Sequence, residues 1–273
     1  MPSPLPQNFS SWDSLLKYYR RGGAERWTGW MFRGQARARW PLESSLERAA
    51  IRRFGLERKD LAELERKMVR DFQRQAHQFP IDAPEEGDRL GWLALMQHWG
   101  APTRLLDWSY SFYAALFFAI ADATPGQVCT VWAIDYRWCG KRIRAMARAA
   151  RHSPLPRSTE QLLFLRPPLA GLYPVNPFRL HQRLIVQQGA FLACGDVKHT
   201  FLANLRKMDP PKASPLRRFN LRCSRRFLTD ALRDLRRMNL THASLFPGLE
   251  GLAKHIGNMI PVLHKLPDDD SAQ

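Results

Sequence analysis

Residues 112–121 read FYAALFFAIA, and this apolar run constrains the fold more than any other part of the chain. A helix that is apolar on every side is buried on every side, so it belongs at the centre of a domain. The run has about half of the roughly 20 residues that a membrane-spanning helix needs, which favours a core helix. The polar segment 97–111 leads directly into it through a turn at Gly100 and Pro102. We therefore expect these polar side chains in a cleft beside the buried helix.

Length and hydrophobic periodicity predict one α+β domain over residues 1–273, with its core at about 12–258. The chain has 273 residues, 45% of them hydrophobic, which is enough for one large core. The apolar spacing predicts helices over 12–19, 41–53, 57–79, 89–99, 112–122 and 249–258, and another that Ser224 caps. Strands are expected over 30–33, 103–108, 127–136 and 183–194. The fold class that follows has N-terminal helices and a mixed, largely antiparallel sheet around the buried helix.

Several kinds of site and location are disfavoured by the sequence. The four cysteines are scattered without a CxxC pair, so we interpret them as reduced, structural thiols. The eight histidines contain no HExxH pairing, and we expect no metal. Neither GxSxG nor a GxxxxGK loop is present. The first residues lack the basic-then-apolar pattern of a signal peptide, so we expect a cytoplasmic protein with no membrane partner.

The positive charge is large and clustered. The net charge is +17, which favours an anionic macromolecule as partner, either nucleic acid or an acidic protein. We expect residues 137–160 to be a basic insertion or surface helix, and the acidic tail 267–273 to be frayed. The candidate nucleic-acid-binding residues are Arg142, Arg144, Arg148, Arg217, Arg218 and Arg225. The alternative is an ordinary solvated basic surface, because a basic stripe carries no sequence information.

Four segments of the chain resemble the FRG domain, in the order that this family has them. They are Phe32-Arg33-Gly34-Gln35 with Trp40-Pro41-Leu42 and Arg48, the central block 97–108 with Ala115–Ala119, Arg183 with Gln187-x-Gly189-x-Phe191, and Ser244–Leu249. Ser109 stands where the family often has Thr, and the exchange keeps the hydroxyl. The family occurs mainly in bacteria and their phages, so the resemblance implies a role in defence, toxicity or regulation.

A more distant likeness is to the ADP-ribosyltransferase superfamily. Those proteins order their site as an arginine on an early strand, a hydroxyl on a middle strand before a packed helix, and Glu or Gln on a late strand. Arg33, Ser109 and Gln187 come in that order, and the likeness implies that they are catalytic and that NAD is the cofactor. The residues that would bind the cofactor are Arg33, Gly34, Gln35, His98, Thr103 and Asp107.

The chemistry gives each of these residues a task and leaves alternatives open. Arg33 would clamp the pyrophosphate or a ribose, Ser109 would bind the ribose or orient Gln187, and Gln187 would hold the sugar. Breaking the nicotinamide–ribose bond develops positive charge, which Gln187 meets only with a dipole. The enzyme would then be slow or activated by its target, or the fold would bind without catalysis. Asp107 would either supply the missing charge or form a structural ion pair with Arg104.

Other hypotheses follow from the same residues. His98 would be a general acid or base or, in the alternative, a histidine that braces the turn. Trp108 and Tyr110 would stack on a base or belong to the core. For the whole protein, the alternatives to an enzyme are a non-catalytic module that binds nucleic acid or a nucleotide, and a regulatory protein whose pocket binds a small ligand without reaction. The sequence contains no signal for an oligomeric state.

Overall fold

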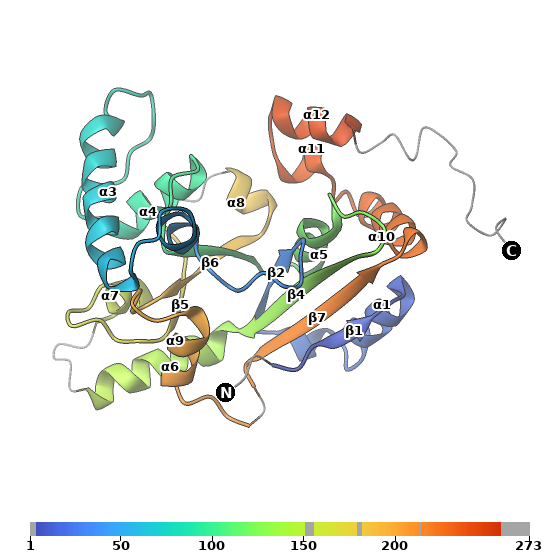
Figure 1. Ribbon diagram of the computed structural model, residues 1–273, viewed down its shortest axis with the longest axis horizontal. Coiled ribbons are helices and arrows are strands. Elements are labelled where there is room, and N and C mark those ends of the chain that lie inside the picture. The colour runs from blue at the N-terminus through green and yellow to red at the C-terminus, as the bar shows by residue number, and fades with distance from the viewer. Residues whose placement is uncertain (1–3, 151–155, 179–181, 213, 258–273) are drawn as a thin grey trace, which may run out of the picture.

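A seven-stranded sheet forms the centre of the computed structural model, which describes residues 4–150, 156–178, 182–212 and 214–257 (Figure 1). The strand order is β1-β7-β4-β2-β3-β6-β5. Neighbouring strands are antiparallel except β1 and β7, which run parallel. The strands are β1 (Gln7–Phe9), β2 (Trp30–Gln35), β3 (Leu105–Ser109), β4 (Gln127–Asp135), β5 (Leu172–Val175), β6 (Gly189–Cys194) and β7 (Leu216–Cys223). The expected α+β fold and largely antiparallel sheet are confirmed.

The two faces of the sheet can be followed in the residues of β4. Cys129, Val131 and Ala133 belong to one hydrophobic cluster, whereas Trp132 and Ile134 belong to another. Successive side chains of a strand point to opposite faces, so the two clusters lie on either side of β4. The continuous apolar sequence of this strand thus reflects burial on both faces.

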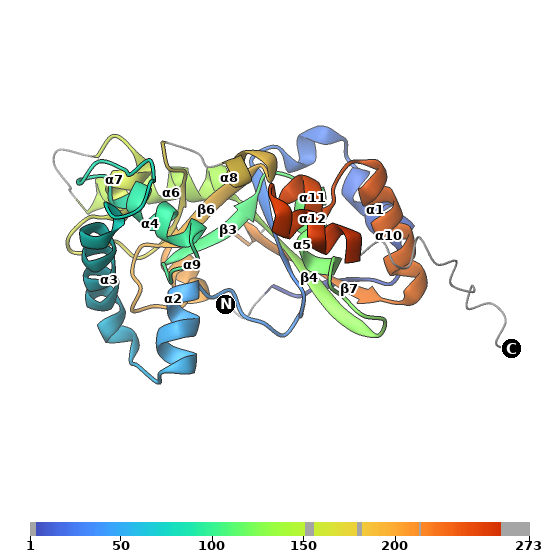
Figure 2. The same ribbon diagram turned by 90° about the horizontal axis from the view of Figure 1, so that it is seen from above.

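Helices from both ends of the chain cover the first face. Figure 2 shows α1 and α10 together at one end of the molecule, and α3, α4 and α7 at the other. Ser11 and Ser224 cap α1 and α10, since each side chain accepts a hydrogen bond from a backbone N–H of the first turn. The elements of this face are α1 (Trp12–Arg20), the 3₁₀ helix η1 (Ala24–Trp27), α5 (Phe112–Ile120), α10 (Arg225–Arg237), α11 (His242–Leu245) and α12 (Leu249–Gly257).

The buried helix α5 lies directly against β2. A Cβ atom added at Gly34 would overlap with the carbonyl oxygen of Ala115, so only glycine lets helix and strand approach this closely. We expected Gly34 among the residues that would bind the cofactor. In the structure it also allows α5 to pack directly on the sheet.

The second face carries α4, α6, α7 and α9, and a smaller group of helices packs beside α4. Cys139, Ile143 and Ala147 form the buried side of α6, so the described part of the expected 137–160 insertion contains a packed helix. The elements are α2 (Ser45–Glu47), the π-helix η2 (Arg48–Arg53), the 3₁₀ helix η3 (Arg58–Asp60), α3 (Leu61–Ala76), α4 (Arg89–His98), α6 (Tyr136–Ala149), α7 (Thr159–Leu163) and α9 (Phe201–Lys207). The predicted tail, 267–273, lies outside the described residues.

One expected strand is wrong over half its length. Residues 183–194 were expected to be a strand, but α8 (Gln182–Val186) precedes a turn and β6 begins only at Gly189. Gln188 has a positive φ of 47°, which turns the chain between the two elements. Leu184 packs so closely on Gly189 that a Cβ atom there would meet its side chain at 2.6 Å. Gln187 therefore lies before a strand rather than on one.

Candidate functional site

Strands β2 and β3 part from each other next to the middle of the sheet. They share one register pair, Phe32 with Ser109, whereas β2 pairs with β4 along its whole length and β3 does the same with β6. Beyond that pair, β2 and β3 form no further register pair. There Nη1 of Arg33 on β2 donates a hydrogen bond to the main-chain oxygen of Asp107 on β3, at 2.5 Å. A cavity lies where the two strands separate, and residues of both strands line it.

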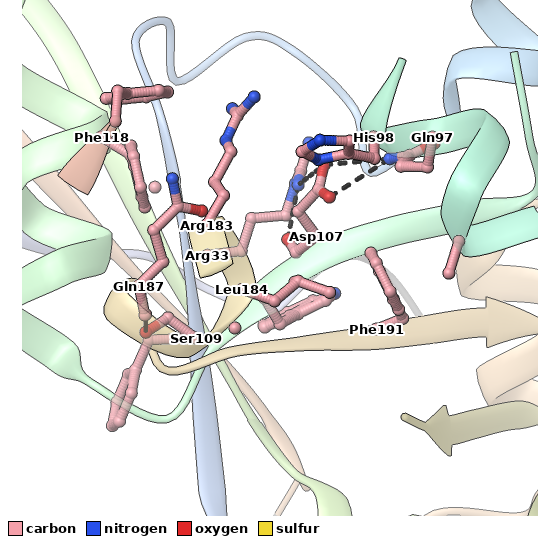
Figure 3. Close-up of a pocket in the computed structure, with 16 residues that line it drawn as sticks. Arg33, Gln97, His98, Asp107, Ser109, Phe118, Arg183, Leu184, Gln187 and Phe191 are labelled. Carbon is pink, nitrogen blue, oxygen red and sulfur yellow. Dashed lines mark hydrogen bonds and ion pairs between the residues drawn. The ribbon is translucent and has the colours of Figure 1, made fainter. Parts of the chain in front are cut away.

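A pocket of about 260 Å³ opens at this point (Figure 3). Its lining comes from β2, α4, β3, α5, α8 and β6, and from the residues that directly follow α8 and α11. Segments that are far apart in the chain therefore meet here. The pocket contains Arg33, Ser109 and Gln187, the three residues that the sequence grouped as catalytic.

Arg33 is largely enclosed, with its side chain 16% exposed. Burial lowers its pKa, and Asp107 partly opposes this through an ion pair in which Nη1 lies 3.9 Å from Oδ2. Arg48 adds a further positive charge that lowers the pKa of Arg33. The Nε of Arg33 is buried and has no hydrogen-bond partner among the described residues. An incompletely neutralised, incompletely bonded guanidinium of this kind favours an anionic ligand.

Ser109 is a positioning residue. Its hydroxyl donates to the main-chain oxygen of Gln187 at 2.7 Å and accepts from the backbone N–H of Ser111 at 2.9 Å. The single donor of the hydroxyl is thus used within the protein. Of the two tasks expected for Ser109, the geometry favours the orientation of Gln187 over a bond to the ribose.

The side chain of Gln187 is held by the helix pair at the end of the described chain. Its Nε2 donates to the main-chain oxygen of Leu245 at 2.8 Å. With the amide nitrogen fixed in this way, the amide oxygen points toward Arg183 and the pocket, as Figure 3 shows. This position therefore offers a hydrogen-bond acceptor and the negative end of a dipole.

Asp107 brings a carboxylate to the mouth of the pocket, where its side chain is 61% exposed. Gln97 donates to both carboxylate oxygens, at 3.1 and 3.2 Å. The amide oxygen of Gln97 in turn accepts from the buried hydroxyl of Thr103 at 2.6 Å. His98 also lines the pocket, beside Asp107. Thr103 acts on the site through Gln97 without lining it.

Two sequence-based assignments change. Gln35 does not line the pocket, because its amide bonds to the indole of Trp132 and to the main-chain oxygen of Pro41. The expected ion pair between Arg104 and Asp107 is wrong. Arg104 forms a buried, bidentate pair with Glu65 of α3, and the charge of Glu65 raises the pKa of Arg104 against its burial. Asp107 is therefore available to the pocket.

The comparisons with known proteins agree with the motifs seen in the sequence. Residues 28–127 match the model of the FRG domain. The chain contains an FRG domain. No curated protein and no solved structure matches the chain. The matched FRG segment holds Arg33, Asp107 and Ser109, whereas Gln187 lies beyond it.

The pocket, which extends from the FRG segment to later parts of the chain, includes residues to which the sequence assigned no role. Phe118, Arg183 and Phe246 all line it, and their presence in family motifs was the signal that could have found them. Trp108 also lines the pocket, and its Nε1 is buried without a partner among the described residues. Tyr110 lies outside, where its hydroxyl accepts from Asn176 at 3.0 Å.

The six arginines expected to bind nucleic acid do not form one surface. Arg217 and Arg218 are neighbours on β7 and face opposite sides of the sheet. The guanidinium of Arg217 lies 4.8 Å from the ring centre of Trp30, and that of Arg218 lies 5.0 Å from the ring centre of Trp132. Arg142 donates to the main-chain oxygen of Met208 at 2.6 Å. Arg144 and Arg148 lie on α6, and Arg225 starts α10.

The described residues contain no candidate metal site and no disulfide. Among the described residues, no group of three or more His, Cys, Asp or Glu side chains is placed to hold a metal ion. The four cysteines are all buried and free. No helix in the described part of the chain is both long and apolar enough to cross a bilayer.

Proposed function

We propose that this protein is an ADP-ribosyltransferase-like enzyme that binds NAD in the pocket between β2 and β3 and consumes it on a macromolecular target. The observation that carries the proposal is the convergence on one cavity of Arg33 from β2, Ser109 from β3 and Gln187 from the turn between α8 and β6. A role in bacterial or phage defence or toxicity remains a prediction from the family resemblance.

The reaction would break the bond between ribose C1′ and the nicotinamide nitrogen. Nicotinamide would leave with the electron pair, and an acceptor oxygen or nitrogen would bond to C1′ and lose its proton. The sugar develops positive charge on the way, as in glycoside hydrolysis. The amide oxygen of Gln187 points into the pocket, and the carboxylate of Asp107 lies in the same pocket. We assign the electrostatic stabilisation of the sugar and the acceptance of the proton to Asp107, because a carboxylate supplies a full charge.

The size of the cavity suggests how the ligand would be placed. Organic ligand sites commonly measure roughly 300–1,000 Å³, and about 260 Å³ is available here. That space suits the nicotinamide and its ribose better than the whole dinucleotide. The phosphates and adenosine would then lie at the open mouth.

Nicotinamide release from NAD tests the proposal directly. Purified protein with cell extract is expected to release nicotinamide and to leave labelled adducts on a macromolecule. Arg33→Ala and Asp107→Asn should each lower the rate by about 100-fold or more, since two to three charge-assisted contacts are lost. Arg226→Ala serves as the matched control, because Arg226 lies on α10 and is 92% exposed in its side chain. An absence of turnover with every fraction, with Arg33→Ala equal to wild type, overturns the enzymatic function.

A second function is favoured by one surface, which we call the α6 stripe. It consists of Arg137, Lys141, Arg144 and Arg148, spaced four, three and four residues apart. This spacing aligns the four residues along one side of the helix, opposite its buried side. The stripe would bind the phosphate backbone of a nucleic acid without catalysis. Affinity should then fall steeply with salt, and replacement of Lys141 and Arg148 by Ala should flatten the slope by about two counterions.

A further inference from the structure

Arg183 brings a second guanidinium to the pocket that Arg33 lines. It belongs to α8, and its guanidinium carbon lies 4.6 Å from the ring centre of Phe246. Both residues line the cavity. No carboxylate or hydrogen-bond acceptor among the described residues pairs with this side chain. Stacking on an aromatic ring holds a guanidinium in place while its edge of N–H groups stays open.

The charges around the cavity are unbalanced. Arg33 and Arg183 face one carboxylate among the described lining residues, Asp107, and that carboxylate is already engaged with Arg33 and Gln97. Arg48 lies close enough to lower the pKa of Arg33. In a pocket that is only partly open to solvent, such an excess of positive charge is screened less than in bulk water and attracts an anion.

Figure 3 shows how the two guanidinium groups lie. Arg183 extends along the cavity beside Gln187, whereas Arg33 lies on the side of Asp107 and His98. A tetrahedral phosphate bound at this place would present oxygens to both guanidinium groups, whereas a planar carboxylate matches one fork at a time. Phe118 and Phe191 add aromatic walls for a ring attached to the phosphate.

We infer that Arg183, stacked on Phe246, is the residue by which this pocket selects ligands that carry a diphosphate over nucleosides that lack one. The inference rests on the proposed function for the identity of the ligand as NAD. The diphosphate of a nucleotide binds to both Arg183 and Arg33, and stacking on Phe246 holds the guanidinium of Arg183 in place.

The test is equilibrium binding to the full chain by calorimetry, with ligands that do not react. ADP-ribose and ADP carry the diphosphate, adenosine carries none, and inorganic pyrophosphate separates the phosphate contribution from that of the nucleoside. The variants are Arg183→Ala, Arg183→Lys and Phe246→Leu, with Arg226→Ala as the matched exposed control. Thermal unfolding of each variant verifies that it is folded.

Wild type should bind ADP-ribose at least 10-fold more tightly than adenosine. Arg183→Ala should weaken the binding of ADP-ribose and ADP by about 10- to 100-fold, as expected for the loss of charge-assisted hydrogen bonds. Its affinity for adenosine should stay within about 2-fold of wild type. Arg183→Lys should recover part of the loss, and Phe246→Leu should lie between wild type and Arg183→Ala. Arg226→Ala should match wild type.

Two results overturn the inference. In the first, Arg183→Ala binds ADP-ribose as tightly as wild type does; in the second, it loses affinity for adenosine and for ADP-ribose by the same factor. Failure of wild type to bind any of the four ligands also overturns it. If wild type binds ADP-ribose through Arg183 but never releases nicotinamide from NAD, the enzymatic function fails while the diphosphate site stands.

Discussion

The hydroxyl of Ser109 donates a 2.7 Å hydrogen bond to the main-chain oxygen of Gln187, a residue 78 positions later in the chain. This bond joins the end of β3 to the turn between α8 and β6. The same hydroxyl accepts from the N–H of Ser111, which caps the buried helix α5. One small side chain thus fixes the turn that carries Gln187 relative to the helix at the centre of the domain.

Replacement of Ser109 by Ala is expected to lower the free energy of unfolding by about 1–3 kcal/mol. Two backbone groups lose their partner at a site where Ser109 is 2% exposed, and water cannot replace the hydroxyl easily. Urea unfolding measures the change. Ser14→Ala provides the control, since the Ser14 hydroxyl also donates to a main-chain oxygen, at 2.9 Å, but lies at the exposed surface of α1. Equal stability of the two variants would count against the positioning role.

Gln187→Glu is expected to reduce stability and to leave nicotinamide release unimproved. The new carboxylate oxygen would face the main-chain oxygen of Leu245, which now accepts a hydrogen bond from Gln187. Two acceptors at that distance repel each other, at a cost of about 1–3 kcal/mol. The pKa of the new carboxyl would be raised, so the lost stability should return as pH falls and the group becomes a donor. A faster enzyme with unchanged unfolding would contradict this account of the amide.

The buried pair of Arg104 and Glu65 is expected to be necessary for the fold as a pair. Their side chains are 9% and 3% exposed. Glu65→Leu or Arg104→Met alone should each destabilise the protein by about 3–5 kcal/mol, because the remaining charge stays buried without its partner. The double variant Glu65→Leu with Arg104→Met should be closer to wild type than either single variant. Urea unfolding of wild type, the two single variants and the double variant gives the coupling energy between the two residues. If the effects of the two single substitutions simply added in the double variant, the prediction would be contradicted.

The buried His242, which stacks on the pocket residue Phe246, is expected to make the free energy of unfolding depend on pH. It lies in α11, buried at 5% exposure, with Phe246 stacked on its ring. Burial lowers its pKa, Asp122 opposes this, and Lys254 and His255 add to it. The unfolded chain then binds the proton more readily than the folded one. Its contribution to stability is present above pH 6.5 and is lost as pH falls toward the folded pKa.

Thermal unfolding between pH 7.5 and pH 5 checks this expectation. Wild type should lose stability more steeply on acidification than His242→Gln, which cannot take up the proton. Parallel curves for the two proteins would show that another group is responsible.

The sequence predicted the elements whose signals are local. The apolar run at 112–122 became α5, the strand expected at 103–108 became β3 at Leu105–Ser109, and 127–136 became β4. Each of these segments carries its own pattern, with a turn or cap at its boundary. The likeness to the ADP-ribosyltransferase superfamily also grouped Arg33, Ser109 and Gln187, and these three residues line one pocket.

The sequence could not predict features that depend on distant partners. The run RLIVQQGAFLAC has the apolar content of a strand, yet its first half is helical because Leu184 folds back on Gly189. β5 contains Pro174, which argues against a strand, but β5 is the last strand in the sheet order and an edge strand tolerates proline. Arg104 was assigned to its neighbour Asp107 because nothing in the sequence shows that Glu65 lies beside it. The stacking of Arg183 on Phe246 likewise appears only when α8 meets the residue that follows α11.

A crystal structure of the protein soaked with NAD or ADP-ribose tests the central claim most directly. The account predicts ligand density in the gap where β2 and β3 part, within hydrogen-bond distance of the guanidinium of Arg33 and the amide oxygen of Gln187. Density elsewhere on the protein, with this gap empty under conditions that saturate binding in solution, would contradict it.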